Sequence, residues 1–246
     1  MASVQPMTFL ALVQRLQRES GTSGAQITTT AGATGEAQRL CDWVTHAYVE
    51  IQEKHEDWLW MTQPFQFNTI AQQQAYSPFT TAFTTPNNPS GLVDFAKWKL
   101  NPTAEESSMR LWLTSIGNIN ETWLNEADWV TFRDFYIFGF RRQTFQRPIT
   151  VAVDPQMNLN LGLAPNDIYT VVGEYYQSPQ ALLLDADMPA MPAMFHMLIV
   201  WYAIEHYAYY EAAAEVLEYA KSATAKMMTT LESQQLPPMQ LPDPLV

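Results

Sequence analysis

The longest pattern of apolar positions at helical spacing lies between Met188 and Leu231. It begins with Pro189 and Pro192 and continues without Gly or Pro. Proline near the first turn is typical of a helix start, because its missing N–H would have no partner there. The apolar stripe changes phase near Tyr209 to Ala212, which favours a helical hairpin over a single long helix. The stripe comprises Phe195, Leu198, Ile199, Tyr202 and Ala203, then Ala213, Leu217, Ala220, Met227 and Leu231.

The N-terminal part predicts two shorter helices. Thr8 is a plausible N-cap for the first, which should end at Gly21. Residues 21–35 are small and polar and should form a loop. They contain no lysine beside their glycines, so a phosphate-binding loop is not expected here. The second helix should run from about Glu36 to His55. Apolar positions on one face of the two helices are Phe9, Leu12, Val13, Leu16, Ala37, Leu40, Cys41, Val44, Ala47, Tyr48 and Ile51.

From Trp58 onward the apolar pattern alternates, as in strands. Phe65 and Phe67 alternate with polar residues before a turn at residues 72–74, which predicts a β-hairpin ending near Tyr76. Residues 77–91 should form an exposed loop and 101–108 a turn. Further elements expected here are strands at 92–100 and 109–114, a short amphipathic helix at 125–136 that ends near Gly139, and a three-stranded meander at 149–153, 159–163 and 168–177.

These elements predict an α+β protein. We expect the N- and C-terminal helices to form an antiparallel helical bundle, with a mostly β insertion between them. The expected division is into N-terminal helices at 1–57, a β-rich insertion with a short helix at 58–187, a C-terminal helix pair at 188–233 and an extended proline-rich arm at 234–246.

Composition narrows the functional class. Of the 246 residues, 47% are hydrophobic and only 15% are charged, with a net charge of −12. An acidic chain is poorly suited to binding the phosphates of a nucleic acid. The many aromatic residues indicate either an oligomer or a single aromatic-rich core. We also expect a soluble protein made in the cytoplasm, because no signal peptide or membrane-spanning stretch is visible.

Candidate chemistry is sparse. The four histidines are scattered, and the single Cys41 on an apolar helix face excludes an internal disulfide. Carboxylate pairs such as Glu105–Glu106 fall in predicted turns, where solvated acids are the usual interpretation. No HExxH or GxSxG motif occurs. We therefore expect no enzyme activity, no cofactor and no metal site.

Arginines cluster in the middle of the chain and are interleaved with phenylalanines. The cluster comprises Arg133, Arg141, Arg142 and Arg147. Arginine with aromatic side chains suits stacking on nucleic-acid bases, but it equally suits a protein interface in which guanidinium groups meet carboxylates. Because the chain is acidic overall, we favour contacts with acids of the same or a neighbouring subunit.

The order of these segments resembles a known family. The start, MTFLALVQRLQRESGTSG, then TGEAQRLCDWVTHAYVEIQEKHEDWLWM, and the later PNDIYTVVGEYYQSPQALLLDADMPAMPAMFHMLIVWYAIEHYAYYEAAAE are similar to adaptor proteins from the neck of tailed bacteriophages. Residues 70–145 match only loosely, and the resemblance depends on the order of several motifs.

The resemblance implies a structural virion protein that connects the head to the tail. Such adaptors form rings, usually dodecameric, beneath the portal protein, contact a tail or nozzle protein, and let DNA pass through the lumen without specific binding. It also implies that extended termini make attachments. Here the arm residues that could do so are Leu236, Pro237, Pro238, Leu241, Pro242 and Leu245.

Two alternatives remain at this stage. The chain could be a tail-completion protein of the phage neck. It could also be an aromatic-rich module whose β segment binds carbohydrate.

Overall fold

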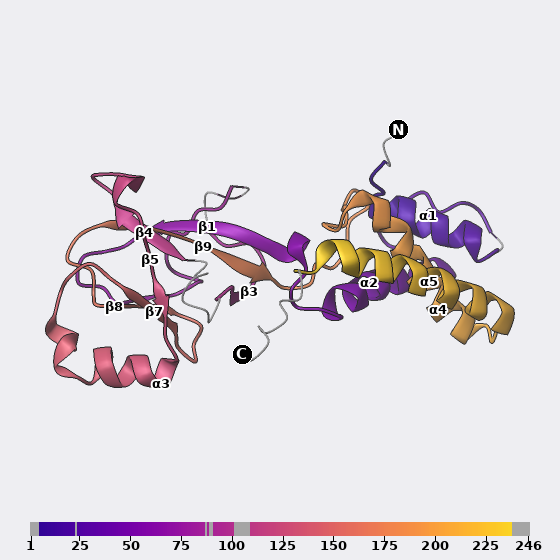
Figure 1. The fold of residues 1–246 in the computed structure, drawn as a ribbon. Coiled ribbons are helices and arrows are strands. Elements are labelled where there is room, and N and C mark those ends of the chain that lie inside the picture. Colours follow the sequence, from indigo (N-terminus) through magenta and orange to yellow (C-terminus); the bar gives the residue numbers. More distant parts are fainter. Residues whose placement is uncertain (1–4, 23, 87, 89–90, 101–108, 238–246) are drawn as a thin grey trace, which may run out of the picture. The chain divides into compact units, whose positions relative to one another are not determined.

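The computed structural model describes residues 5–22, 24–86, 88, 91–100 and 109–237. The chain divides into a helical unit, Met1–Met61 with Pro179–Val246, and a β unit, Thr62–Ser178. The described residues form five α-helices and two β-sheets, so the predicted α+β class is confirmed (Figure 1). The β unit lies inside the 58–187 range expected for the insertion, because Trp58 and Leu182 are buried in the core of the helical unit.

The two N-terminal helices begin and end close to their predicted positions. α1 spans Phe9–Glu19, and the Thr8 hydroxyl accepts a hydrogen bond from the Ala11 N–H at 3.3 Å, as an N-cap does. α2 spans Glu36–Glu53. The buried side chains follow the helical period predicted from the sequence: Phe9, Leu12, Val13 and Leu16 in α1, and Leu40, Cys41, Val44, Ala47, Tyr48 and Ile51 in α2.

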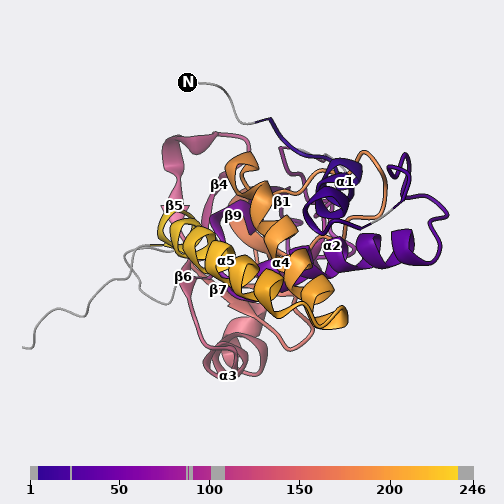
Figure 2. The same ribbon diagram turned by 90° about the vertical axis from the view of Figure 1, so that its right-hand side faces the viewer.

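The C-terminal region forms the predicted helical hairpin. A short 3-10 helix, η5 at Ala193–Phe195, leads into α4 at His196–Tyr210, and α5 spans Ala214–Gln235. The chain reverses between them, where Ala212 has a φ of 52°. α4 and α5 therefore pack side by side, and the alternative of one continuous helix is wrong (Figure 2).

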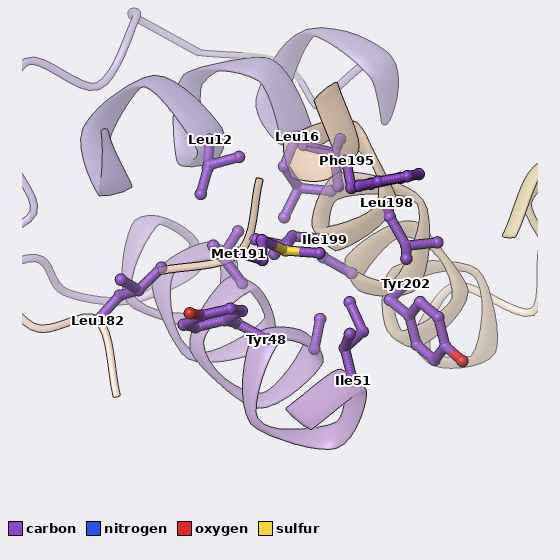
Figure 3. Packing of buried hydrophobic residues seen from close by; sticks show 14 of the residues in the cluster. Leu12, Leu16, Tyr48, Ile51, Leu182, Met191, Phe195, Leu198, Ile199 and Tyr202 are labelled. Carbon is purple, nitrogen blue, oxygen red and sulfur yellow. The ribbon is translucent and has the colours of Figure 1, made fainter. Parts of the chain in front are cut away.

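α4 is the central helix of the helical unit and packs against α1, α2 and α5. This explains why it is apolar on most of its circumference, since a helix surrounded by others buries more than one stripe. Figure 3 shows side chains of α1 and α2 converging on those of η5 and α4. The labelled residues are Leu12, Leu16, Tyr48, Ile51, Leu182, Met191, Phe195, Leu198, Ile199 and Tyr202.

The segment that returns from the β unit is tied to α2. The Gln52 side chain donates to the Gln180 carbonyl at 3.0 Å and accepts from the Gln180 N–H at 2.9 Å. Farther on, the Asp185 carboxylate accepts hydrogen bonds from the hydroxyl and N–H of Thr30 and from the Thr29 hydroxyl, which hold the pKa of Asp185 below its usual value. These contacts fix both the return segment and the loop before α2.

The larger sheet of the β unit is organised around β9, Tyr169–Gln177. β1, Thr62–Asn68, pairs antiparallel with it along its length, from Thr62 opposite Tyr176 to Asn68 opposite Thr170. β3 (Phe95–Trp98) and β4 (Arg110–Leu113) also pair antiparallel with β9, and β5 (Thr122–Trp123) pairs with β4.

The smaller sheet has the order β2-β8-β7-β6. Its strands are β2 (Ala75–Tyr76), β8 (Leu159–Gly162), β7 (Thr150–Val153) and β6 (Asn125–Glu126). Leu159, Leu161 and Val151 share a buried cluster with Phe65, Phe67 and Val171 of the larger sheet. Side chains between them on β7 and β8, such as Ala152 and Asn160, are buried as well, so these strands are covered on both faces.

Two predicted strand pairings are wrong. β1 and β2 do not form a hairpin, because β1 pairs with β9 while β2 pairs with β8 in the other sheet. The three-stranded meander is also wrong: β7 and β8 pair as expected, but β9 belongs to the larger sheet. Alternation shows that a strand has one buried face, but it carries no information about which strand lies at its edge.

The helix predicted at 125–136 begins later than expected. Asn125 and Glu126 pair in parallel with β7. The Asp128 carboxylate then accepts hydrogen bonds from the N–H groups of Val130 and Thr131, so the helix begins after Asp128. It continues as α3, Trp129–Phe132, and as one π-helical turn, η3, Arg133–Ile137. The apolar positions of this helix, Trp129, Phe132 and Tyr136, all follow Asp128, which marks the boundary.

Candidate interaction surface

The residues of α3 and η3 divide between a buried face and an exposed face. Phe132 and Tyr136 are buried with Ala152 of β7 and with Leu163, the residue that follows β8. A Cβ on Gly162 would lie 2.8 Å from the Phe132 ring and 2.9 Å from the Tyr136 ring, so only glycine allows this close packing. The buried face fixes the direction in which the remaining side chains of the segment point.

Large apolar side chains of η3 and of the residues that follow it are exposed. Phe135 is 56% exposed, Phe138 68% and Phe140 86%. Isolated exposed apolar residues are ordinary, but three phenylalanines within six positions make this segment a candidate contact surface. Figure 1 shows this segment as the coil labelled α3 and the turns that follow it.

Three of the four predicted arginines accompany these phenylalanines. The Arg133 guanidinium forms an ion pair with Asp134 at 3.0 Å and lies 5.5 Å from the Phe138 ring centre. That of Arg141 lies 5.8 Å from the rings of both Phe135 and Phe140. The side chain of Arg142 is exposed and has no ion pair with any residue that the structure describes. We call these residues the Arg–Phe surface: Arg133, Phe135, Phe138, Phe140, Arg141 and Arg142.

The fourth arginine, Arg147, has a different position. Its guanidinium donates to the backbone carbonyls of Leu111, at 3.1 Å, and Asn120. Arg147 thus joins its own segment to β4 and to the short helix η2, Asn118–Asn120. The sequence cluster is therefore split between a surface and a structural contact inside the β unit.

A tight turn at Gly139 gives the Arg–Phe surface its shape. A Cβ at this position would lie 2.9 Å from the backbone oxygen of Phe135. Glycine lets the chain leave η3 and enter the next short helix, η4 at Phe140–Gln143, without that clash. The turn brings Arg141 back over the ring of Phe135.

The predicted arm begins two residues later than expected, because α5 continues to Gln235. Leu236 is extended and packs against the core of the helical unit. Pro237 is described, whereas the other predicted contact residues, Pro238, Leu241, Pro242 and Leu245, lie outside the described residues.

A second group of exposed aromatics lies on the α4–α5 hairpin, with Tyr209 and Tyr210 at the end of α4 and Tyr219 farther along α5 beside Trp201. Tyr209 is 62% exposed, Tyr210 56% and Tyr219 66%, and the side chains of Glu211, Glu215 and Glu218 are exposed beside them in the chain. We call these six residues the Glu–Tyr surface. None of the six was predicted as a contact residue, although the phase change at Tyr209 to Ala212 was the available signal.

The buried titratable groups have local structural partners. His196 accepts a hydrogen bond from the Met7 N–H at 2.9 Å and lies 3.1 Å from the Met191 carbonyl, and burial lowers its pKa. Burial also raises the pKa of the Cys41 thiol to about 11, which makes it a poor nucleophile.

The described residues contain neither a cluster of metal-ligating side chains nor a helix suited to a membrane. No group of three or more His, Cys, Asp or Glu side chains there is arranged to hold a metal ion. Within that same part of the chain, no helix combines the length and apolarity that crossing a bilayer requires.

Comparison with known proteins supplies the family. No curated protein matches the chain. A family model described as "SU10 adaptor protein" matches residues 7–241, which is nearly all of it and includes both units. The family is one of structural adaptors of bacteriophages and not of enzymes. The chain therefore belongs to the SU10 adaptor protein family, in agreement with the head–tail adaptor resemblance of its sequence.

Proposed function

We propose that this adaptor forms a ring in the phage neck, where it connects the portal protein to the tail and lets DNA pass through its lumen. The observation that carries the proposal is the Arg–Phe surface. Aromatic residues and arginine are enriched in the centres of protein interfaces, and here they are exposed together on one chain. A ring of identical subunits would cover this surface on every copy.

Charge supports a passive role for the lumen. DNA-binding proteins hold phosphates with clustered Lys and Arg, and each neutralised phosphate adds to the affinity for the duplex. With a net charge of −12 per chain, a ring of this protein presents few such contacts. Acidic side chains toward the lumen would let DNA slide through without being bound.

The C-terminal arm is the proposed attachment to the portal. Its proline-rich sequence loses little conformational entropy on binding, because proline already restricts the backbone. The antiparallel bundle expected for the four long helices would give the arm a rigid base. Leu236, which packs against the helical core, would mark the point where that base ends.

Native mass spectrometry and electron microscopy, with and without the portal protein, test this function. We expect closed rings, or subunits assembled on the portal ring. A protein that stays monomeric at micromolar concentration even with portal present would contradict the proposal. For the arm, a chain that ends at Pro237 keeps Leu236 and should form the same oligomer while losing affinity for the portal. Unchanged portal binding would exclude the arm as the attachment.

A further inference from the structure

The Glu–Tyr surface has features of a prepared binding site. The Tyr210 ring lies 5.7 Å from the Trp43 ring and 4.7 Å from the Arg39 guanidinium, both on α2. The Tyr219 ring meets Trp201 edge-on at 5.4 Å. These contacts hold exposed tyrosines in place before any partner arrives, and this lowers the entropy lost on binding.

The charges of this surface are opposite to those of the Arg–Phe surface. Glu211 and Glu215 form no ion pair with any residue in the described part of the chain. The nearest bases are occupied locally: Arg39 donates to the Tyr210 hydroxyl, and Lys221 lies 5.5 Å from the Tyr209 ring. On the other surface Arg142 has no acidic partner among the described residues, and Arg133 has only Asp134. The named residues of the Arg–Phe surface carry three positive charges, and those of the Glu–Tyr surface carry three negative charges.

The two units also differ in overall charge. By sequence the helical unit contains 6 Lys and Arg against 15 Asp and Glu, a formal charge of −9. The β unit contains 7 against 10, a formal charge of −3, and 3 of its 7 bases are on the Arg–Phe surface. A basic patch on the less acidic unit is attracted to the acidic unit of another copy, which brings the two surfaces together.

We propose that the Arg–Phe surface of one copy docks on the Glu–Tyr surface of the next. Arginine pairs with glutamate through two parallel hydrogen bonds and also stacks on tyrosine, while phenylalanine packs edge-to-face with it. Because two different patches meet, the contact is head-to-tail, and such contacts close into rings when the rotation permits. This inference rests on the proposed ring and assigns its subunit contact.

Charge reversal tests the contact. One variant carries Arg141→Glu and Arg142→Glu, the second carries Glu215→Arg and Glu218→Arg, and a third carries all four changes. Because like charges would then face each other, each of the first two should need about 100-fold more protein to assemble. The third chain should assemble like wild type. The first two should also assemble when mixed, because both of their contacts then join opposite charges.

A matched control separates this contact from general charge effects. Glu53→Arg with Asp57→Arg makes the same change in charge on the helical unit, near the far end of α2 from Arg39. This variant should assemble normally. All substituted side chains are at least partly exposed, so the thermal midpoints of all variants should match wild type, as circular dichroism will report.

Several results would overturn the contact. One is normal assembly of either two-site reversal, and another is no rescue by mixing or by the fourfold change. Loss of duplex DNA binding by the Arg141→Glu, Arg142→Glu variant, with unchanged assembly, would assign the Arg–Phe surface to nucleic acid instead. Normal assembly of a reversal, or failed rescue, would leave the wild-type ring and with it the proposed function intact. DNA binding by the Arg–Phe surface would also contradict a lumen that does not bind DNA. Failure of wild type to assemble with portal would refute both.

Discussion

The inward and outward side chains of the segment from Trp129 to Arg147 are of the same types but have opposite surroundings. Inward, Phe132 is fully buried and Arg147 donates to two backbone carbonyls. Outward, Phe138 is exposed and Arg142 has no ion pair within the described residues. The inward groups hold the β unit together, and the outward groups are free for another molecule. What faces a side chain, more than its type, decides its role.

Replacing one phenylalanine from each side should give the largest difference in the free energy of unfolding. Phe132→Ala removes a ring packed against the smaller sheet and should lower the free energy of unfolding by about 3–5 kcal/mol. Phe138→Ala should leave it within about 0.5 kcal/mol of wild type, but should weaken assembly. Urea denaturation and native mass spectrometry measure the two effects. Equal losses of stability would abolish the distinction between the two sides.

Replacing the inward Arg147 should likewise cost more stability than replacing the outward Arg142, but the difference should be smaller than for the phenylalanines. Arg147→Met leaves the Leu111 and Asn120 carbonyls without their donor, which should cost about 1–3 kcal/mol of stability. Arg142→Met should cost under about 0.5 kcal/mol, since exposed charges contribute little. Thermal melts of both variants check this. If Arg142→Met were the less stable variant, Arg142 would have a structural role.

A substitution at Gly139 should affect both stability and assembly. Gly139→Ala places a methyl group against the Phe135 backbone oxygen, and we expect a loss of about 1–2 kcal/mol as the turn shifts. The shift should also displace Arg141 and weaken assembly, although no surface residue is changed. Stability and assembly are measured as before. Normal assembly with reduced stability would show that the shape of the turn does not matter to the partner.

The smallest effect should be a pH dependence confined to the helical unit. Burial lowers the pKa of His196, so below its ordinary value of 6.5 the unfolded chain binds a proton that the folded chain resists. Stability is therefore complete above that pH and falls as the pH drops toward the lowered pKa. His196→Asn, which keeps an acceptor for the Met7 N–H, should show a smaller decrease in melting temperature between pH 7.5 and pH 5. An identical decrease would assign the effect to other groups.

The four long helices of this protein could be predicted from sequence because their signals are local. Thr8 caps α1, and the phase change near Tyr209 marks the end of α4. Strand partners could not be predicted, since Phe65 and Phe67 alternate in the same way whether β1 pairs with β2 or with β9. Nor does the sequence distinguish Arg142 from Arg147. Only the position of β4 and η2 shows that one of them has carbonyls within reach.

The helical unit is built from both ends of the chain, and this determines when it can fold during translation. During translation α1 and α2 leave the ribosome first, but α4, the helix on which they pack, begins only at His196. At 5–20 residues per second the wait is on the order of ten seconds. During that interval the entire β unit is synthesised, while the apolar faces of α1 and α2 still lack their partner. A subunit interrupted before α4 therefore has no closed helical core, so only chains that include α4 should be competent to assemble.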